Sequence, residues 1–248
     1  RLYRGDAAGW PDHLRGVFDR EGITDLVLLG ARRERHFAAI AAAREAGVQV
    51  HHVELGYVRP DWLTVEPDGA GPDGRFPRDW PALEALARGP EPAETPVFRA
   101  PFWRNAAMDV GWNMSNVLAS WATHPHFRHH AIWHPLAEYG GFLLRQAQLG
   151  RRAAHAARVW EAWGAPGPPL FLFPLQLRTD FQIRAHGPDP DLRDTVRGVV
   201  RSFARHAPAD ARLIVKEHPM DNALTPWRRI AKEAAGAAAD RVEVIDGG

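Results

Sequence analysis

Two polar loops, each directly after a short apolar run, constrain the fold of this chain more than any other feature. Leu170 to Leu175 and Arg212 to Val215 have the composition of short buried strands, and the segments PLQLRTDFQIR and IVKEHPMD continue from them. Polar groups that follow buried strands of an α/β sheet gather at its carboxyl edge. The alternative is two unrelated loops with ordinary turn residues. The side chains expected at the shared edge are those of Gln176, Asp180, Gln182, Lys216, His218 and Asp221.

The amino-terminal part predicts a βαβ unit. Asp25 to Leu29 is strand-like, Arg33 to Ala46 has helical spacing, and Val48 to Val53 resumes a strand. The topology rules make these strands parallel neighbours joined by a right-handed helical crossover. Gly30 and Glu54 would then lie at equivalent strand ends. Gly30 lacks the companion glycines of a dinucleotide fingerprint, which argues against a nicotinamide-dependent enzyme.

The carboxyl-terminal part repeats this plan, with strands expected at 170–175, 212–216 and 241–245 and helices at 191–206 and 225–237. Between the two parts, Phe102 to Arg158 has the periodicity of two or three helices. We therefore expect an α/β protein of two Rossmann-like lobes, residues 1–165 and 166–248, as in GT-B-type glycosyltransferases. The chain starts without methionine and stops after a strand-like run, so we expect a truncated carboxyl-terminal lobe.

Composition excludes several classes of protein. The chain has 248 residues, a net charge of +1 and no cysteine. Near-neutral charge gives no indication of nucleic-acid binding, and the lack of cysteine excludes a disulfide scaffold and thiolate chemistry. No apolar run has the length of a transmembrane helix. These features are typical of a cytoplasmic protein.

Four segments together carry a specific resemblance. They are ELGYVRPDWLTVE from Glu54, PLQLRTDFQIR, SFARHAP from Ser202, and KEHPMD. Their combination resembles the capsule polysaccharide biosynthesis and export family of Gram-negative bacteria, and within it the S-type branch, over about Leu26 to Gly247. The resemblance implies a β-Kdo transferase that uses CMP-Kdo as donor and a phosphatidylglycerol-linked Kdo glycolipid as acceptor. It also implies that the carboxyl-terminal lobe holds most of the donor.

The resemblance and the chemistry together select candidate catalytic residues. An inverting sugar transfer needs a carboxylate that takes the proton of the acceptor hydroxyl. Asp180 matches the acid of the family's Q-x-x-x-D loop and is the first candidate, and Glu54, in the E-x-G-[YF] motif, is the second. The structural alternatives are a helix or turn cap for Asp180 and an ion pair with Arg59 for Glu54.

Loss of CMP places negative charge on one phosphate, and the loop after the second strand of the carboxyl-terminal lobe offers cations. Lys216 and His218 can neutralise this charge without a metal, and Asp221 and Gln176 complete the expected donor site. His218-Pro219 matches the family's H-P pair. The alternative for His218 is a loop histidine with a structural hydrogen bond.

The remaining site candidates concern the acceptor or the sugar carboxylate. Arginine forks match carboxylates, so Tyr57 and Arg59 are expected to bind the sugar together with Gln182. Arg33 and His36 match an R-x-x-H pattern, although Ala31 stands where relatives carry aspartate.

Three other patterns favour structural roles. Asp189-Pro-Asp191 has the form of a metal-binding D-x-D motif, but its proline and its place before a helix favour a turn and a cap. The histidines between His126 and His134 lack a pattern of accompanying ligands, so no metal site is predicted. Most of the tryptophans are expected in the core rather than on sugars or a membrane.

The sequence thus predicts a glycosyltransferase that requires neither a metal nor another cofactor. The predicted partners of this protein are a CMP-sugar donor and a glycolipid acceptor. The resemblance further implies contact with a capsule assembly complex and peripheral association with the inner face of the inner membrane. The alternative from another class is a non-catalytic capsule assembly or export factor that binds lipid-linked polysaccharide. A sugar-nucleotide epimerase on the same plan explains fewer of the motifs.

Overall fold

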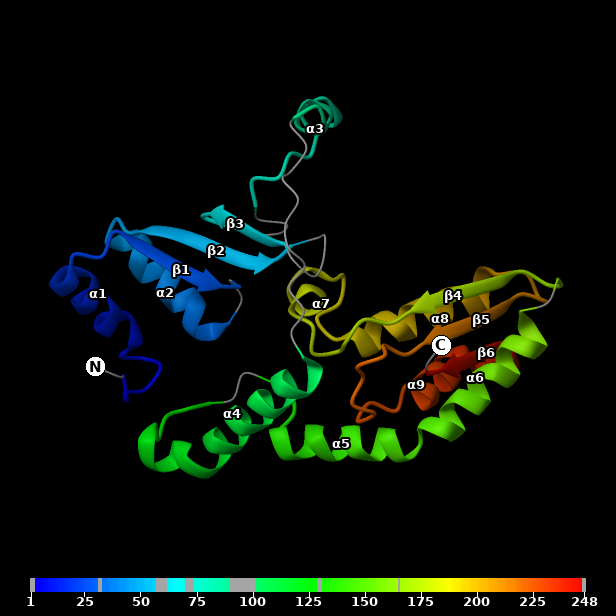
Figure 1. The fold of residues 1–248 in the computed structure, drawn as a ribbon. Coiled ribbons are helices and arrows are strands. Elements are labelled where there is room, and N and C mark those ends of the chain that lie inside the picture. The colour runs from blue at the N-terminus through cyan, green and yellow to red at the C-terminus, as the bar shows by residue number, and fades with distance from the viewer. Residues whose placement is uncertain are drawn as a thin grey trace. The chain divides into compact units, whose positions relative to one another are not determined.

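The computed structural model of the chain describes residues 3–30, 33–56, 62–69, 74–89, 101–128, 131–164 and 166–246. The chain forms two compact units, Arg1–His130 and Ala131–Gly248, and each is described by itself (Figure 1). Each unit contains one three-stranded sheet. The expected α/β fold class is confirmed.

The sheet of the first unit contains the predicted βαβ unit and one additional strand. Strands β1 (Asp25–Leu29) and β2 (Gln49–Leu55) are parallel and are joined by helix α2 (Glu34–Glu45). Gly47, with φ of 70°, follows this helix, as its freedom to adopt positive φ predicts. Strand β3 (Leu63–Pro67) pairs antiparallel with β2 and was not predicted.

Helices cover one face of the first sheet. Helix α1 (Trp10–Glu21), which was also not predicted, packs with α2 against Leu28 and Val50 in one core. On the opposite face, Val27 and Leu29 of β1 and Val65 of β3 are exposed. The first core therefore lies on the helical side of the sheet.

The tryptophans of the long helix α4 (Phe102–Thr123) do not lie in the core. Trp103, Trp112 and Trp121 are exposed by 81%, 68% and 75%. The expectation of core tryptophans is wrong for these three residues and for Trp62, which is 40% exposed, and none of the described side chains of α4 is buried. The short helix α3 (Trp80–Ala87) agrees with the helical stretch expected near Trp80.

The second unit contains the predicted three parallel strands, in the order β4 (Leu170–Pro174), β5 (Arg212–Lys216) and β6 (Val242–Ile245). The prediction that β4 is buried is wrong, because Phe171 and Leu172 on this strand at the end of the sheet are 46% and 51% exposed. Helices α8 (Leu192–His206) and α9 (Trp227–Ala235) pack on one face, and the 3₁₀ helix η2 (Gly236–Arg241) leads into β6. Apolar residues of both helices and alternate residues of β5 form the main core of this unit. This core fixes the strands whose ends carry the motif loops.

Helices α5 (Pro135–Ala147) and α6 (Leu149–Trp163) belong to the second unit. Ala156 and Val159 of α6 pack against Ile214 and Ile245, on the face of the sheet opposite α8 and α9. The sequence-based boundary at 165 separates these helices from the sheet that α6 covers. The arrangement of the two sheets as GT-B lobes stays a prediction.

None of the described helices combines the length and the hydropathy needed to cross a membrane.

Candidate functional site

The two motif loops start side by side at the carboxyl edge of the second sheet. Pro174 is the register partner of Lys216 at the ends of parallel β4 and β5. The next residue, Leu175, donates its N–H to the carbonyl oxygen of Lys216 at 2.8 Å. This pairing holds the two loop origins together, as expected for polar loops that follow neighbouring parallel strands.

The loops meet again farther out, around an open pocket of about 140 Å³. Three consecutive residues after β4, Leu177 to Thr179, form one wall, and Met220, Asp221 and Asn222 form the second. Helix α5 and the residues before it provide the third wall, with Trp133, Glu138 and Phe142. The guanidinium of Arg178 lies 5.4 Å from the centre of the Trp133 ring. Of the side chains expected at this edge, only Asp221 lines the pocket, and the helical wall was not predicted.

Asp180 caps helix α7 (Phe181–His186), which begins directly after it. Its Oδ1 accepts the backbone N–H of Gln182 at 2.8 Å. Among the described residues, no hydrogen bond to Oδ2 is present. Gln176 and the side chain of Gln182 are exposed. Asp180 therefore makes the cap contact that was weighed against its catalytic role, and one carboxylate oxygen remains available.

Lys216 and His218 are half-buried at the start of the second loop. The ammonium group of Lys216 makes no hydrogen bond or ion pair within the described part of the chain, whereas that of Lys232 in α9 donates to the carbonyl oxygen of Ala239 and to Glu243. His218 Nδ1 accepts the N–H of Met220 at 3.0 Å, so its Nε2 carries the proton when the ring is neutral. The end of β5 and the loop after it thus carry an ammonium group, unpaired among the described residues, and an imidazole two positions later.

Asp221 is buried and has partners on both oxygens. Oδ1 accepts the N–H of Ala223 at 2.8 Å, and Oδ2 accepts the indole N–H of Trp227 at 3.0 Å. These contacts shape the turn between β5 and α9. Ala223 lies in this turn with φ of 57°, a left-handed conformation that is costly for alanine.

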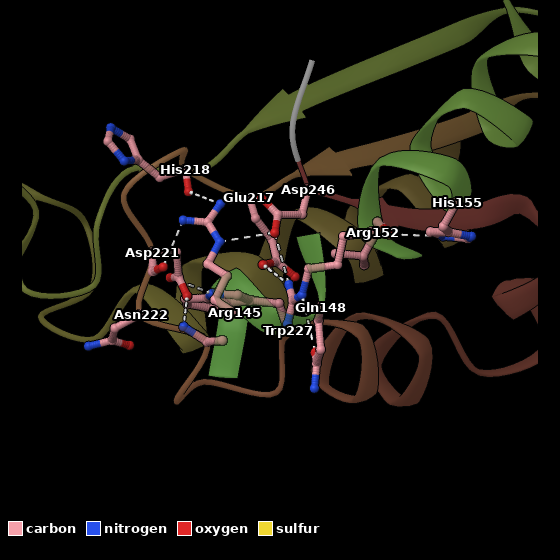
Figure 2. A network of polar contacts seen from close by, with 12 residues as sticks. Arg145, Gln148, Arg152, His155, Glu217, His218, Asp221, Asn222, Trp227 and Asp246 are labelled. Carbon is pink, nitrogen blue, oxygen red and sulfur yellow. Dashed lines mark hydrogen bonds and ion pairs between the residues drawn. The ribbon is translucent and has the colours of Figure 1, made fainter. Parts of the chain in front are cut away.

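A buried ionic network lies behind the second loop (Figure 2). Arg145 of α5 binds both carboxylate oxygens of Asp246, which follows β6. Arg152 of α6 lies 3.0 Å from Asp246 and 3.2 Å from Glu217, measured between nitrogen and oxygen. The network therefore connects helices α5 and α6 to the ends of β5 and β6.

Within this network, the pKa of Glu217 is well above the ordinary value for a glutamate. Burial raises its pKa to about 7, and the neighbouring carboxylates of Asp221 and Asp246 act in the same direction. The positive charges of Arg152 and Arg145 oppose this rise without cancelling it. For Asp246, burial also favours the neutral form, but hydrogen bonds from Arg145 and Arg152 outweigh it and lower the pKa. The two carboxyl groups of one network thus shift in opposite directions.

The D-x-D-like segment forms a cap, as predicted. Asp191 accepts the backbone N–H of Arg193 at 3.0 Å at the start of α8. Its side chain also pairs with the guanidinium groups of Arg178 and Arg193. Burial opposes ionisation, yet these hydrogen bonds hold the pKa of Asp191 well below its usual range. The carboxylate is therefore engaged by protein groups at neutral pH.

The other candidates belong to the first unit. Glu54 is half-buried near the end of β2, opposite Thr64 of β3. Arg33 is exposed before α2, and His36 Nδ1 lies 2.8 Å from the carbonyl oxygen of Gly30. Ala31 and the two loop candidates after β2, Tyr57 and Arg59, lie outside the described residues. Their roles stay predictions.

The sequence profile described as "Capsule polysaccharide biosynthesis protein" matches residues 24–246. The chain belongs to this family. The resemblance that the motifs indicated is confirmed, because the match includes both loops of the pocket and the strands before them. No solved structure matched the chain significantly.

Individual relatives agree with this assignment. The chain is 31% identical over 238 residues to the capsule polysaccharide modification protein LipB of Neisseria meningitidis serogroup A, a stretch that covers 93% of this chain and 56% of LipB. It is 30% identical over 241 residues to LipB of serogroup B, with the same shares of 93% and 56%. Identity to the capsule polysaccharide export protein KpsS of Escherichia coli is 27% over 235 residues, covering 90% of this chain and 57% of KpsS. The chain thus spans little more than half the length of these relatives.

The ionic network was not predicted, although the sequence contains one signal for it. Asp246 directly follows the mainly apolar segment Val242 to Ile245, as the polar loops follow the other two strands. The same rule applied to this third strand would have selected it. No comparable signal marked Arg145, because its partners are distant in the chain.

Proposed function

We propose that this chain contributes the donor site of a glycosyltransferase of capsule biosynthesis, which transfers Kdo from CMP-Kdo to a lipid-linked Kdo acceptor. The carboxyl edge of the second sheet supports this proposal most strongly. There, β5 ends at Lys216, whose ammonium group is unpaired among the described residues, His218 follows on the next loop, and the loop of Asp180 begins beside it. Membership in the family gives the reaction its biological setting, and LipB and KpsS are named for capsule modification and export.

The loop after β5 provides cationic groups suited to the leaving phosphate. When the bond between the anomeric carbon and the phosphate oxygen breaks, its electron pair stays on CMP and adds negative charge to the phosphate. An ammonium group and an imidazole N–H stabilise such charge in a partly dehydrated site more strongly than in water. In this proposal, Lys216 and His218 bind the phosphate and require no metal.

Asp180 is the proposed base. The acceptor hydroxyl transfers its proton to Oδ2 of Asp180 while the hydroxyl oxygen forms a bond to the anomeric carbon. A base of this kind contributes about 100- to 10,000-fold to the rate. Oδ1 keeps its hydrogen bond to Gln182, which orients the carboxylate. The cap and the catalytic role therefore use different oxygens of one side chain.

The substitution Asp180→Asn separates these two roles. Asparagine caps helices as well as aspartate does, so the variant keeps the contact with Gln182 but cannot act as a base. We expect Asp180→Asn to unfold at the same denaturant concentration as the unchanged protein. Transfer from CMP-Kdo to a Kdo-bearing lysophosphatidylglycerol acceptor should fall by about 100-fold or more. Asp79→Asn, which changes the cap of α3, is the matched control and should keep full activity.

The products distinguish the proposal from its alternatives. Direct displacement with Asp180 as base inverts the anomeric configuration, so NMR of a product with retained configuration would contradict this mechanism. A folded protein that binds the acceptor but releases no CMP would instead support the assembly or export factor. Interconversion of nucleotide sugars would support an epimerase.

A further inference from the structure

Arg145 is a buried arginine whose hydrogen bonds converge on the loop after β5. Its guanidinium donates to the carbonyl oxygen of Asp221 at 2.8 Å and to that of His218 at 3.3 Å. It also donates to the carbonyl oxygen of Pro219. The remaining donors bind Asp246. One side chain of α5 thus contacts three carbonyl groups within four consecutive residues of the loop that contains His218 and Pro219.

Helix α5 approaches the same loop at a second position. A Cβ atom on Gly141 would lie 2.2 Å from the carbonyl oxygen of Asn222, which is far inside van der Waals contact. Gly141 precedes Arg145 by four residues, so both lie on one face of the helix. This face therefore contacts the loop with backbone at one turn and with a guanidinium at the next.

The hydrogen bonds from Arg145 determine which groups of the loop face the ionic network and which face away from it. Because the carbonyl oxygens of His218 and Pro219 point at Arg145, the backbone on this side of the loop is fixed. The imidazole of His218 points away from the network (Figure 2). Five donors in a rigid plane restrict the loop more than a flexible lysine could.

We propose that Arg145 is a positioning residue, which holds the loop 217–222 in the conformation that presents Lys216 and His218 to an anionic phosphate group. Asp246 fixes the guanidinium, and Gly141 permits the close approach of α5. This inference rests on the proposed function for the identity of the anion. The control of loop conformation by α5 can be tested without it.

Two measurements on purified protein test the proposal. Hydrogen exchange followed by mass spectrometry reports on the loop, whose Met220, Asp221 and Ala223 amides are hydrogen-bonded. Calorimetric titration with CMP reports on the anion site. In Arg145→Met, we expect exchange of the loop amides to be roughly tenfold faster while α8 exchanges at an unchanged rate. CMP affinity should fall by about tenfold.

Two further variants distinguish a local effect on the loop from a general loss of stability. Arg145→Lys keeps the charge but not the fork, so its loop exchange and CMP affinity should lie between those of Arg145→Met and the unchanged protein. Arg151→Met removes an exposed arginine of α6 and should alter neither quantity. In transfer assays, Arg145→Lys should raise the donor KM more than it lowers kcat, because binding of the phosphate is the affected step.

Gly141→Ala keeps the test decisive if Arg145→Met does not fold. The added methyl group pushes the loop from α5 while Arg145 is intact, and the loop amides should again exchange faster than those of α8. Unchanged loop exchange in a folded variant of either position would overturn the proposal. If the unchanged protein does not bind CMP, the proposed function fails, and loop exchange still decides whether Arg145 positions the loop.

Discussion

Asp221 and Trp227 are joined by a buried hydrogen bond of 3.0 Å from the indole nitrogen to Oδ2. Trp227 is 1% exposed and lies in the main core of the second unit, whereas Asp221 lines the pocket. The bond therefore connects the packing of α9 directly to the loop that carries the site.

Replacing Trp227 by phenylalanine should destabilise the protein by about 1–3 kcal/mol, because it leaves a buried carboxylate oxygen without its donor and creates a small cavity. Denaturant unfolding measures this change. Trp80→Phe, at a residue that is 74% exposed, should change the free energy of unfolding by less than about 0.5 kcal/mol. Equal effects of the two substitutions would show that the Asp221 contact is not important for stability.

Glu217 should make stability fall as the pH rises. Its pKa is about 7 in the folded protein, above the ordinary value of 4.5, so folding takes up a proton between these pH values. The protonated side chain therefore gives its full contribution to stability below the ordinary pKa of 4.5, and this contribution is lost as the pH rises through about 7.

The variant Glu217→Gln removes this titration. Relative to the variant, the unchanged protein should lose up to about 3 kcal/mol of stability between pH 4 and pH 8, as measured by denaturant unfolding at both values. A stability difference that is independent of pH would contradict the raised pKa.

Asp191 should make the protein less stable as the pH falls, which is the opposite of the effect of Glu217. Its pKa is lowered, so its contribution is present above the ordinary pKa and is lost as the pH falls. Asp191→Asn keeps the cap of α8 but loses the charge paired with Arg178 and Arg193, and it should cost about 1 kcal/mol at pH 7. Thermal unfolding from pH 7 to pH 2 should show the difference shrink. The exposed pair of Asp194 with Arg197 provides the control, and Asp194→Asn should have a smaller effect at every pH.

The strands of the second unit could be predicted because their signal is local. Strand β5 contains the apolar run Leu213 to Val215, and the polar residues after it mark the sheet edge. Strand β3 was missed although Leu63 and Val65 alternate with Thr64 and Glu66, because the segment was interpreted only as a motif loop. Helix α1 was also missed. It is followed by Gly22, with φ of 62°, and a glycine at this position is a signal for the end of a helix.

The contacts of Arg145 could not be predicted in this way. Its hydrogen-bond partners are 73 to 101 positions away, so no local pattern distinguishes it from an exposed helical arginine. The same holds for Gly141, whose role depends on the loop that packs against it. The roles of these residues follow only from the contacts of α5 with the loop after β5 and with Asp246.

In the proposed site, the edge beside β5 binds a CMP phosphate through Lys216, and calorimetric titration with CMP and with cytidine tests this binding most directly. We expect the protein to bind CMP more tightly than cytidine, and we expect Lys216→Met to weaken CMP binding by about tenfold or more without affecting cytidine. Lys232→Met, which removes a lysine already paired with Glu243, should leave both affinities unchanged. Equal affinity for CMP and cytidine, or undiminished CMP binding by Lys216→Met, would contradict the account.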